Sequence, residues 1–165
     1  MGELVAVLSG KGGTGKTSVC AGVATALAQD GEKVLCIDCD IGLRNLDIAL
    51  GMSELAALSF EDVCRGDYTL DMAAAHPLYP TLRFLTAPMQ LSPEEIDGEA
   101  FEALLREAQL HYDYVFLDAP AGIERGFRLA ACHADRVTLV TGSDPASVRD
   151  AGRTAELLEQ KKKKN

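Results

Sequence analysis

The feature that most constrains this chain is a glycine-rich segment, residues 10–17, which reads Gly-Lys-Gly-Gly-Thr-Gly-Lys-Thr. It follows a short apolar run, residues 4–8, and precedes a helical pattern that extends to about Gln29. This order of strand, glycine loop and helix is the setting in which the pattern G-x-x-x-x-G-K-[ST] binds phosphates. Glycines let backbone N–H groups turn inward, and the helix N-terminus adds positive dipole character. The segment therefore predicts a phosphate-binding loop, with a purely structural glycine turn as the alternative.

Two side chains of this loop have predicted roles of their own. Lys16 is expected to reach the β- and γ-phosphates of a nucleotide, and the Thr17 hydroxyl is expected to bind Mg²⁺. The predicted nucleotide-binding residues are Gly10, Lys11, Gly12, Gly13, Thr14, Gly15, Lys16, Thr17 and Ser18.

The remaining pattern alternates short apolar runs with helical stretches. The further runs are residues 33–37, 82–85, 114–117 and 137–140. Near-continuous apolar runs of this length are typical of strands that are covered on both faces. The alternation predicts an α/β doubly wound fold with a mainly parallel sheet flanked by helices, as in P-loop nucleoside triphosphatases.

Two helices between and after these strands have recognisable starts. One is expected after Ser92 as its N-cap, with Pro93 at the first helical position. The other is expected to begin near residues 143–145. The apolar residues at helical spacing are Phe101, Leu104, Leu105, Ala108 and Tyr112 in the first helix, and Val148, Ala151, Ala155 and Leu158 in the second.

Three aspartates are placed where a metal ion could be held. Asp38 and Asp40 follow the second strand, and Asp118 ends the fourth. In open α/β sheets, ligands bind at the carboxyl ends of the strands. Acids beside a triphosphate repel it unless Mg²⁺ or water lies between them. Thr17, Asp38 and Asp118 are therefore the predicted Mg²⁺ site, and solvated loop acids are the alternative.

Composition narrows the class of protein. The 165 residues suit one domain, and the formal net charge is −9, with 25 acidic against 16 basic residues. That balance argues against a general nucleic-acid-binding surface. No stretch approaches the roughly 20 apolar residues of a membrane span, and no basic leader is visible, so we expect a cytoplasmic protein. We expect residues 1–160 to form the domain and residues 161–165, with four lysines, a solvated tail.

The cysteines and histidines suggest no further chemistry. Five cysteines have no framework spacing, and the pair Cys36 and Cys39 is expected to place its thiols on opposite faces of a strand. Ordinary buried thiols are thus favoured over a redox or metal pair. His76, His111 and His133 are scattered, and no catalytic role is predicted for them.

The second lysine of the loop points to a family. Lys-Gly-Gly-Thr-Gly-Lys-Thr, with Lys11 before Lys16, resembles the deviant Walker A ATPases of the ParA and MinD family. The resemblance implies an ATP-dependent homodimer in which Lys11 reaches the partner's nucleotide. It also implies that Asp40 orients the attacking water, so that Lys11, Lys16 and Asp40 are the predicted catalytic residues.

Residues 42–47, 120–124 and 147–150 resemble the MinD branch of that family, and the similarity extends from about Glu3 to Leu158. It implies an ATP- and Mg²⁺-dependent switch in division-site placement, with MinC-like and MinE-like regulators and no nucleic acid. It further implies peripheral association with the anionic inner membrane through a C-terminal amphipathic helix. ParA-type segregation ATPases, flagellar-number regulators and metal-insertion ATPases share the loop, and a non-catalytic nucleotide-binding fragment is a further alternative.

The chain also departs from the family pattern. Ala119 stands where the MinD branch usually has Ser. The family's C-terminal strands, the Asn that reads adenine and the membrane helix are not visible in this sequence. We therefore expect an incomplete P-loop domain.

Overall fold

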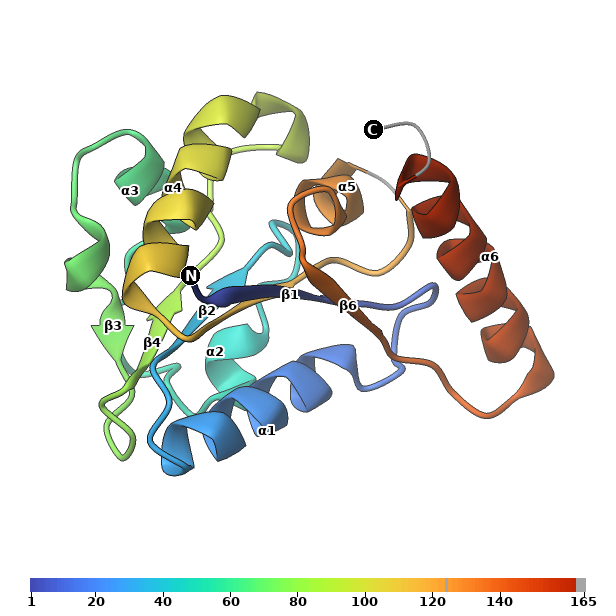
Figure 1. Ribbon diagram of the computed structural model, residues 1–165, viewed down its shortest axis with the longest axis horizontal. Coiled ribbons are helices and arrows are strands. Elements are labelled where there is room, and N and C mark those ends of the chain that lie inside the picture. The colour runs from blue at the N-terminus through green and yellow to red at the C-terminus, as the bar shows by residue number, and fades with distance from the viewer. Residues whose placement is uncertain (124, 163–165) are drawn as a thin grey trace.

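A six-stranded sheet forms the centre of the protein (Figure 1), whose computed structural model describes residues 1–123 and 125–162. Its strand order is β3-β4-β2-β5-β1-β6, and only β3 runs antiparallel to its neighbour. The strands are β1 (Glu3–Leu8), β2 (Val34–Asp38), β3 (Ala74–Ala75), β4 (Leu82–Leu85), β5 (Tyr114–Asp118) and β6 (Arg136–Leu139). The helices are α1 (Lys16–Gln29), α2 (Leu46–Ala49), α3 (Phe60–Cys64), α4 (Gly98–His111), α5 (Arg125–Ala131) and α6 (Pro145–Lys162), with the 3₁₀ turns η1 (Leu70–Met72) and η2 (Pro93–Glu95). The α/β fold with a mainly parallel sheet is as predicted.

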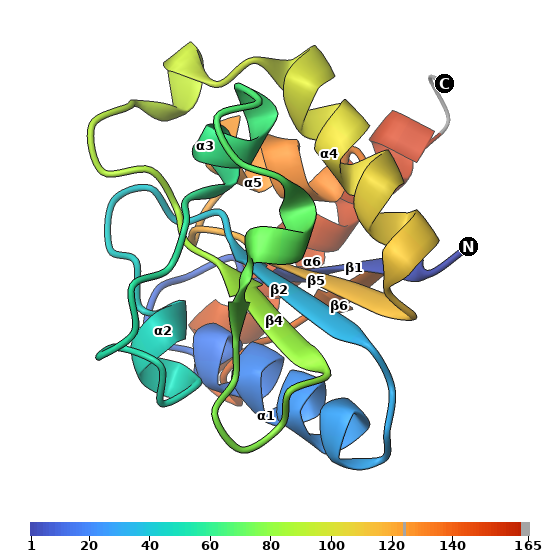
Figure 2. The same ribbon diagram turned by 90° about the vertical axis from the view of Figure 1, so that its left-hand side faces the viewer.

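Helices cover both faces of the sheet. Figures 1 and 2 show α3, α4 and α5 on one face and α1 and α2 on the other. Alternate residues of β1 divide between the two apolar cores: Leu4, Ala6 and Leu8 face the first, and Val5 and Val7 face the second. A strand that contributes to two cores must be apolar at successive positions, which explains the near-continuous runs in the sequence.

The five predicted strands are confirmed, with boundaries shifted by at most one residue. Strand β3 was not predicted from the sequence; it consists of two alanines paired with Phe84 and Arg83 of β4. Two alanines carry neither the β-branched nor the aromatic side chains that indicate a strand. Their pairing depends on the neighbouring strand.

The helix predicted to begin at Ser92 starts later. Ser92 and Glu95 do form a capping arrangement, but they cap only η2, because Ile96 returns to an extended conformation. Asp97 then caps α4 by accepting hydrogen bonds from the N–H groups of Glu99 and Ala100, at 3.0 and 3.2 Å. The predicted core stripe of α4 is confirmed: its four apolar residues Phe101, Leu104, Leu105 and Ala108 are buried, and Tyr112 is partly buried.

The last helix, α6, begins where predicted, and its expected apolar face is buried only in part, with Leu158 half-buried against the core. Ala151 is buried, yet Val148 is 53% exposed, and over residues 145–160 the other buried side chains are Ser147 and Thr154. This face packs against the glycine loop, as described below. The run of lysines expected as a tail begins inside α6, which continues to Lys162. Residues 163–165 lie outside the described part of the chain.

The two cysteines of the C-x-x-C pattern are separated as expected. Cys36 belongs to the core beside α1, and Cys39 belongs to the core on the opposite face. Both are buried free thiols. Among the described residues, no helix is long and apolar enough to cross a membrane.

Candidate functional site

The glycine loop connects the carboxyl end of β1 to the start of α1. Gly13 and Gly15 have φ angles of 76° and 86°, a region that residues with a Cβ rarely adopt. Gly10 is required for a different reason: a Cβ there would lie 2.8 Å from the carbonyl oxygen of Asp150 and 2.9 Å from Thr154 Oγ1. The last helix therefore packs directly on the first residue of the loop.

A cavity of about 470 Å³ opens between this loop and α2. It is lined by Ser9, residues 12–18, and six residues of the segments that follow β2 and β5, among them Asp40. Two hydroxyl oxygens in its wall, Ser9 Oγ and Thr14 Oγ1, are buried and have no hydrogen-bond partner in the structure. Buried polar atoms are nearly always paired, so these two hydroxyls indicate a polar ligand in the cavity.

Lys16 and Asp118 form an ion pair at the base of the site. Lys16 Nζ lies 2.5 Å from Asp118 Oδ1, and the two side chains are 8% and 1% exposed. Thr17 Oγ1 donates to Asp118 Oδ2 at 2.8 Å, and Lys16 Nζ also lies 3.2 Å from Thr17 Oγ1. The three predicted ligands of phosphate and Mg²⁺ thus contact one another.

Asp38 lies beside Asp118 because β2 and β5 are adjacent and pair these two residues. The Asp38 carboxylate accepts hydrogen bonds from the N–H groups of Asp40 at 2.9 Å and Leu46 at 3.2 Å. Burial raises the pKa of Asp38 to about 7, and the nearby charges of Asp118 and Asp40 add to this effect. Burial also raises the pKa of Asp118, although the ammonium of Lys16 opposes the shift. Two buried acids side by side favour a cation between them and a ligand.

Asp40 organises the loop that follows β2. Its carboxylate Oδ1 accepts hydrogen bonds from the N–H groups of Gly42 and Leu43, at 3.2 and 3.1 Å. Further along, Arg44 has a φ of 52°, which is unusual for a residue with a long side chain. Its guanidinium donates to Thr86 Oγ1 at 2.9 and 3.2 Å, tying the loop to the end of β4. The strained residue is held by that anchor.

Lys11 lies at the outer surface of the loop. It is exposed, and its ammonium forms no ion pair with any residue that the structure describes. Its positive charge lowers the pKa of Asp144, after the larger effect of hydrogen bonds from Ser147. A lysine in this position is available to a group outside its own chain.

The fold brings together nearly all the residues that the sequence indicated. Lys16, Thr17, Asp38, Asp118 and the glycine loop meet at the carboxyl ends of β1, β2 and β5. The segment after β5 also reaches the loop, because Gly122 donates its N–H to the carbonyl oxygen of Ser9 at 3.2 Å. Glu124, the last residue of the 120–124 motif, lies outside the described residues.

Sequence reasoning missed several residues of the cavity wall. Ser9 directly precedes the glycine loop, and its position at the end of an apolar strand could have indicated a role. Leu43 and Ala121 in loops, and Ile48 and Ala49 in α2, also line the cavity, but small and apolar residues give no such signal. His76, to which no catalytic role was given, is buried and bonded to backbone groups.

The donor set suits Mg²⁺ bound with a nucleotide. Among the described residues, no group of three or more His, Cys, Asp or Glu side chains could hold a metal ion alone. Mg²⁺ in nucleotide sites is bound through one or two carboxylates, with waters and phosphate oxygens completing its shell. Thr17 and Asp118, already in contact, supply such a partial set.

The fold and this loop define a P-loop nucleotide-binding domain. The family model described as "CobQ/CobB/MinD/ParA nucleotide binding domain" matches residues 5–165, and the chain belongs to this family. Within it, the chain is similar to MinD. It is 42% identical over 160 residues to the septum site-determining protein MinD of Thermotoga maritima.

Solved structures agree with this assignment. The MinC:MinD cell division protein complex of Aquifex aeolicus matches with a TM-score of 0.87 and 38% identity, over 99% of this chain and 66% of that one. MinD of Pyrococcus horikoshii, complexed with Mg-ADP, matches with a TM-score of 0.82 and 28% identity, over 97% of this chain and 66% of that one.

The match covers only part of the relatives. The Thermotoga alignment includes 96% of this chain but 59% of the MinD sequence. The chain therefore spans about three fifths of the length of the curated relatives.

Proposed function

We propose that this chain binds Mg-ATP in the cavity beside the glycine loop and hydrolyses it to ADP and phosphate. The carrying observation is the pair of buried, unpartnered hydroxyls of Ser9 and Thr14 in a cavity that Lys16 also lines. A phosphate is a strong acceptor, and two hydroxyls, an ammonium and the backbone N–H groups of a glycine loop would all donate to it. The Mg-ADP in the solved structure of a relative supports the same ligand class.

In this proposal, ligand binding exchanges the partners of a buried ion pair. Lys16 and Asp118 form this pair at the base of the cavity. With nucleotide present, Lys16 would turn its ammonium from Asp118 to the β- and γ-phosphates, and Asp118 and the Thr17 hydroxyl would be free to hold the metal ion. Mg²⁺, when bound, would supply positive charge that offsets the charge of the phosphates. Asp38, beside Asp118, adds a second carboxylate to this group.

Asp40 and Lys11 have roles in hydrolysis and dimer formation. Asp40 lines the cavity and would orient the attacking water with its carboxylate. Lys11 is exposed at the loop surface and would reach the nucleotide of a second copy, so that closure of a homodimer depends on ATP. The switch would place the division site, as the names of the MinD relatives indicate.

The expected partners follow from the relatives. The MinC:MinD complex supports a MinC-like partner, and we add a MinE-like regulator as part of the proposal. Residues 1–160 would act as one ATPase domain; of the predicted tail, residues 161–165, the first two belong to the end of α6. Peripheral binding to the anionic inner membrane would require a C-terminal amphipathic helix, and nucleic acid is not expected as a partner.

A second candidate is a chain that binds nucleotide without turnover. The chain spans about three fifths of the relatives' length, so their whole activity is not carried over to it directly. Release of phosphate from bound ATP separates the two candidates.

Calorimetry with Mg-ATP tests the proposed site. Lys16→Ala should weaken binding by at least about 100-fold, because the buried charge that faces the phosphates is lost. Lys33→Ala is the matched control, since this exposed lysine lies at the opposite end of β2. The affinity of this variant for Mg-ATP should equal that of the unmodified chain. A folded Lys16→Ala variant with unchanged affinity would contradict the assignment.

Thr14→Val tests the same site without disturbing the ion pair. Valine keeps the shape of threonine and removes a hydroxyl that has no partner in the structure. The fold should therefore remain as stable, while ATP affinity falls by about three- to tenfold, the value of one hydrogen bond. Equal affinity would mean that the hydroxyl faces no ligand.

A further inference from the structure

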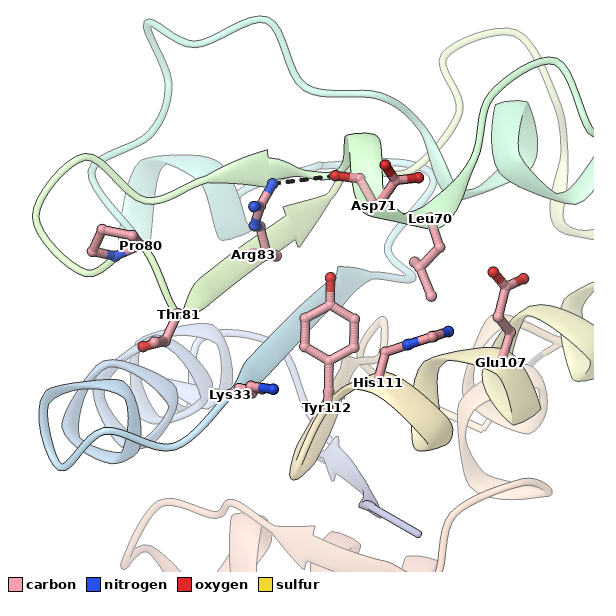
Figure 3. Close-up of a pocket in the computed structure, with 9 residues that line it drawn as sticks. All are labelled: Lys33, Leu70, Asp71, Pro80, Thr81, Arg83, Glu107, His111 and Tyr112. Atoms are coloured by element: carbon pink, nitrogen blue, oxygen red, sulfur yellow. Dashed lines mark hydrogen bonds between the residues drawn. The ribbon is translucent and has the colours of Figure 1, made fainter.

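A second cavity lies at the other end of the sheet, near the amino ends of β2 and β4 and the carboxyl end of α4 (Figure 3). Its volume is about 530 Å³, which is within the range of small-molecule sites. The nucleotide cavity lies at the carboxyl ends of the strands, so the two share no lining residue. Nothing in the proposed ATPase cycle uses this second cavity.

Two cationic side chains line this cavity, Arg83 and Lys33, and both have N–H groups without a partner among the described residues. Arg83 Nη1 donates to the backbone carbonyls of Ala73 at 2.9 Å and Asp71 at 3.3 Å, which fixes the plane of the guanidinium. Its Nε and Nη2 groups have no hydrogen-bond partner among the described residues. Lys33 is exposed, and its ammonium likewise forms no ion pair within the described part of the chain. A preoriented guanidinium with free N–H groups is suited to a planar carboxylate.

Between the ends of the cavity lies an apolar surface. Figure 3 shows the Tyr112 ring and the Leu70 side chain directed into the same space. Burial raises the pKa of the Tyr112 phenol, so the hydroxyl stays protonated and is a donor. It has no hydrogen-bond partner among the residues described. A flat ring with a free donor can support the apolar body of a ligand and contact its polar end.

The acidic residues determine which ligand fits. Lys33 and Arg83 are balanced in formal charge by Asp71 and Glu107. In Figure 3 the Asp71 carboxylate points away from the Tyr112 ring, and Glu107 lies on the far side of His111 from Lys33. Asp71 adjoins Arg83, but its carboxylate is turned away from the space beside Tyr112, so a singly charged anion there is attracted by Lys33 and Arg83 more than it is repelled by the acids. A phosphate carries more charge, which increases the attraction and the repulsion alike, but it has no apolar body to pack against Tyr112 and Leu70.

We propose that this cavity binds a small carboxylate-bearing molecule with an apolar body. Arg83 and Lys33 hold the carboxylate, and the body packs against Tyr112 and Leu70. The site is a second ligand site, independent of the nucleotide site.

The test is an NMR titration of the ¹⁵N-labelled chain with three probes. 3-Phenylpropionate carries a ring and a carboxylate, phenethylamine carries a ring and an ammonium, and inorganic phosphate carries charge alone. We expect saturable shifts of the Arg83 and Tyr112 amides with 3-phenylpropionate, at a Kd of about 1 mM, as for a weakly held fragment. Phenethylamine and phosphate should give no saturable shifts there. No saturation by 3-phenylpropionate up to about 20 mM, or equal binding of phenethylamine, would overturn the proposal.

Variants identify the residues that hold the carboxylate. Arg83→Met should weaken 3-phenylpropionate binding by about tenfold and Lys33→Gln by about threefold, since a bidentate pair contributes more than a single charge. Arg83→Lys keeps the charge and loses the fork, and it replaces Arg83→Met if that variant does not fold. Arg106→Met, on the exposed side of α4, is the control and should bind as before. Unchanged affinity in both Lys33→Gln and the Arg83 variant would refute the site.

The two ligand sites can be separated in the same samples. Lys16→Ala should lose Mg-ATP and keep 3-phenylpropionate, whereas Lys33→Gln should keep Mg-ATP and lose affinity for 3-phenylpropionate. Failure of ATP binding therefore leaves this inference unaffected, and its own failure leaves the nucleotide site unaffected.

Discussion

Charged side chains are buried at the carboxyl ends of the strands and exposed at the amino ends. At the carboxyl ends, Lys16, Asp38 and Asp118 are 8%, 1% and 1% exposed, and each depends on a neighbouring group for its partner. At the amino ends, Lys33 and Glu107 are exposed, and water solvates them. Removing a charge should therefore be costly at the first end and nearly neutral at the second. This difference in cost means that the charged side chains of the candidate nucleotide site also contribute to the stability of the fold, whereas those at the opposite end do not.

The largest expected effect is on turnover. Asp40→Ala should retain Mg-ATP and lose hydrolysis by about 100-fold or more, because the proposed task of Asp40 is to orient water in the transition state. Phosphate release and ATP affinity are measured on the same sample. Asp71→Ala, an acid at the other end of the sheet, should leave both values unchanged. Normal turnover by Asp40→Ala would mean that another residue orients the attacking water.

The next effect concerns stability without nucleotide. Lys16→Ala leaves Asp118 buried without its cation, and the free energy of unfolding should fall by about 3 kcal/mol. Lys33→Ala should change it by less than about 0.5 kcal/mol. Urea denaturation of both variants measures the difference. An equal change in the free energy of unfolding in the two variants would contradict the proposed difference between the two ends of the sheet.

Stability should also depend on pH through Asp38. Burial raises its pKa from 3.8 to about 7, so in the folded state the carboxyl keeps a proton that the unfolded chain releases near pH 4. The folded state then binds more protons between these values, and stability falls as the pH rises through that window. We expect the free energy of unfolding to be about 2 kcal/mol lower at pH 8 than at pH 5.

Urea denaturation at both pH values, without Mg²⁺, measures this difference. Asp38→Asn should remove most of it, while Asp71→Asn, at the other end, should not. A stability that rises from pH 5 to pH 8 in the unmodified chain would contradict the assignment.

The smallest effect is expected for an exposed ion pair at the amino ends of the strands. Arg136 Nε lies 2.8 Å from Glu3 Oε1, but the Arg136 side chain is 68% exposed. Arg136→Ala should lower the free energy of unfolding by at most about 0.5 kcal/mol, and added salt should reduce even that. A loss comparable to that of Lys16→Ala would show that exposure does not govern the value of these pairs.

The sequence by itself predicted the parts of the protein that local patterns encode. Apolar runs gave five strands, because residues buried on two faces must be apolar at successive positions. The glycine loop indicated its own conformation, since Gly13 and Gly15 adopt φ angles that other residues avoid. The aspartates at the ends of β2 and β5 were recognised from a local pattern too, because they are polar residues that terminate apolar runs.

Helix starts were only partly predictable. Ser92 and Asp97 are both good caps, and each caps a segment in the structure. Which of them begins the long helix depends on where Phe101 and Leu104 meet the sheet. Both positions carry a capping arrangement, so packing decides between them.

Only the tertiary structure decided which charges meet. Asp38 and Asp118 are far apart in the sequence, and they lie side by side because β2 and β5 are neighbours in register. The same arrangement pairs Lys16 with Asp118 and shifts the pKa of Asp38. The cavity at the amino ends likewise combines residues of β4, α4 and η1 that no motif connects. Burial and pairing of charges depend on strand order, and strand order is set by contacts between distant segments rather than by any local pattern.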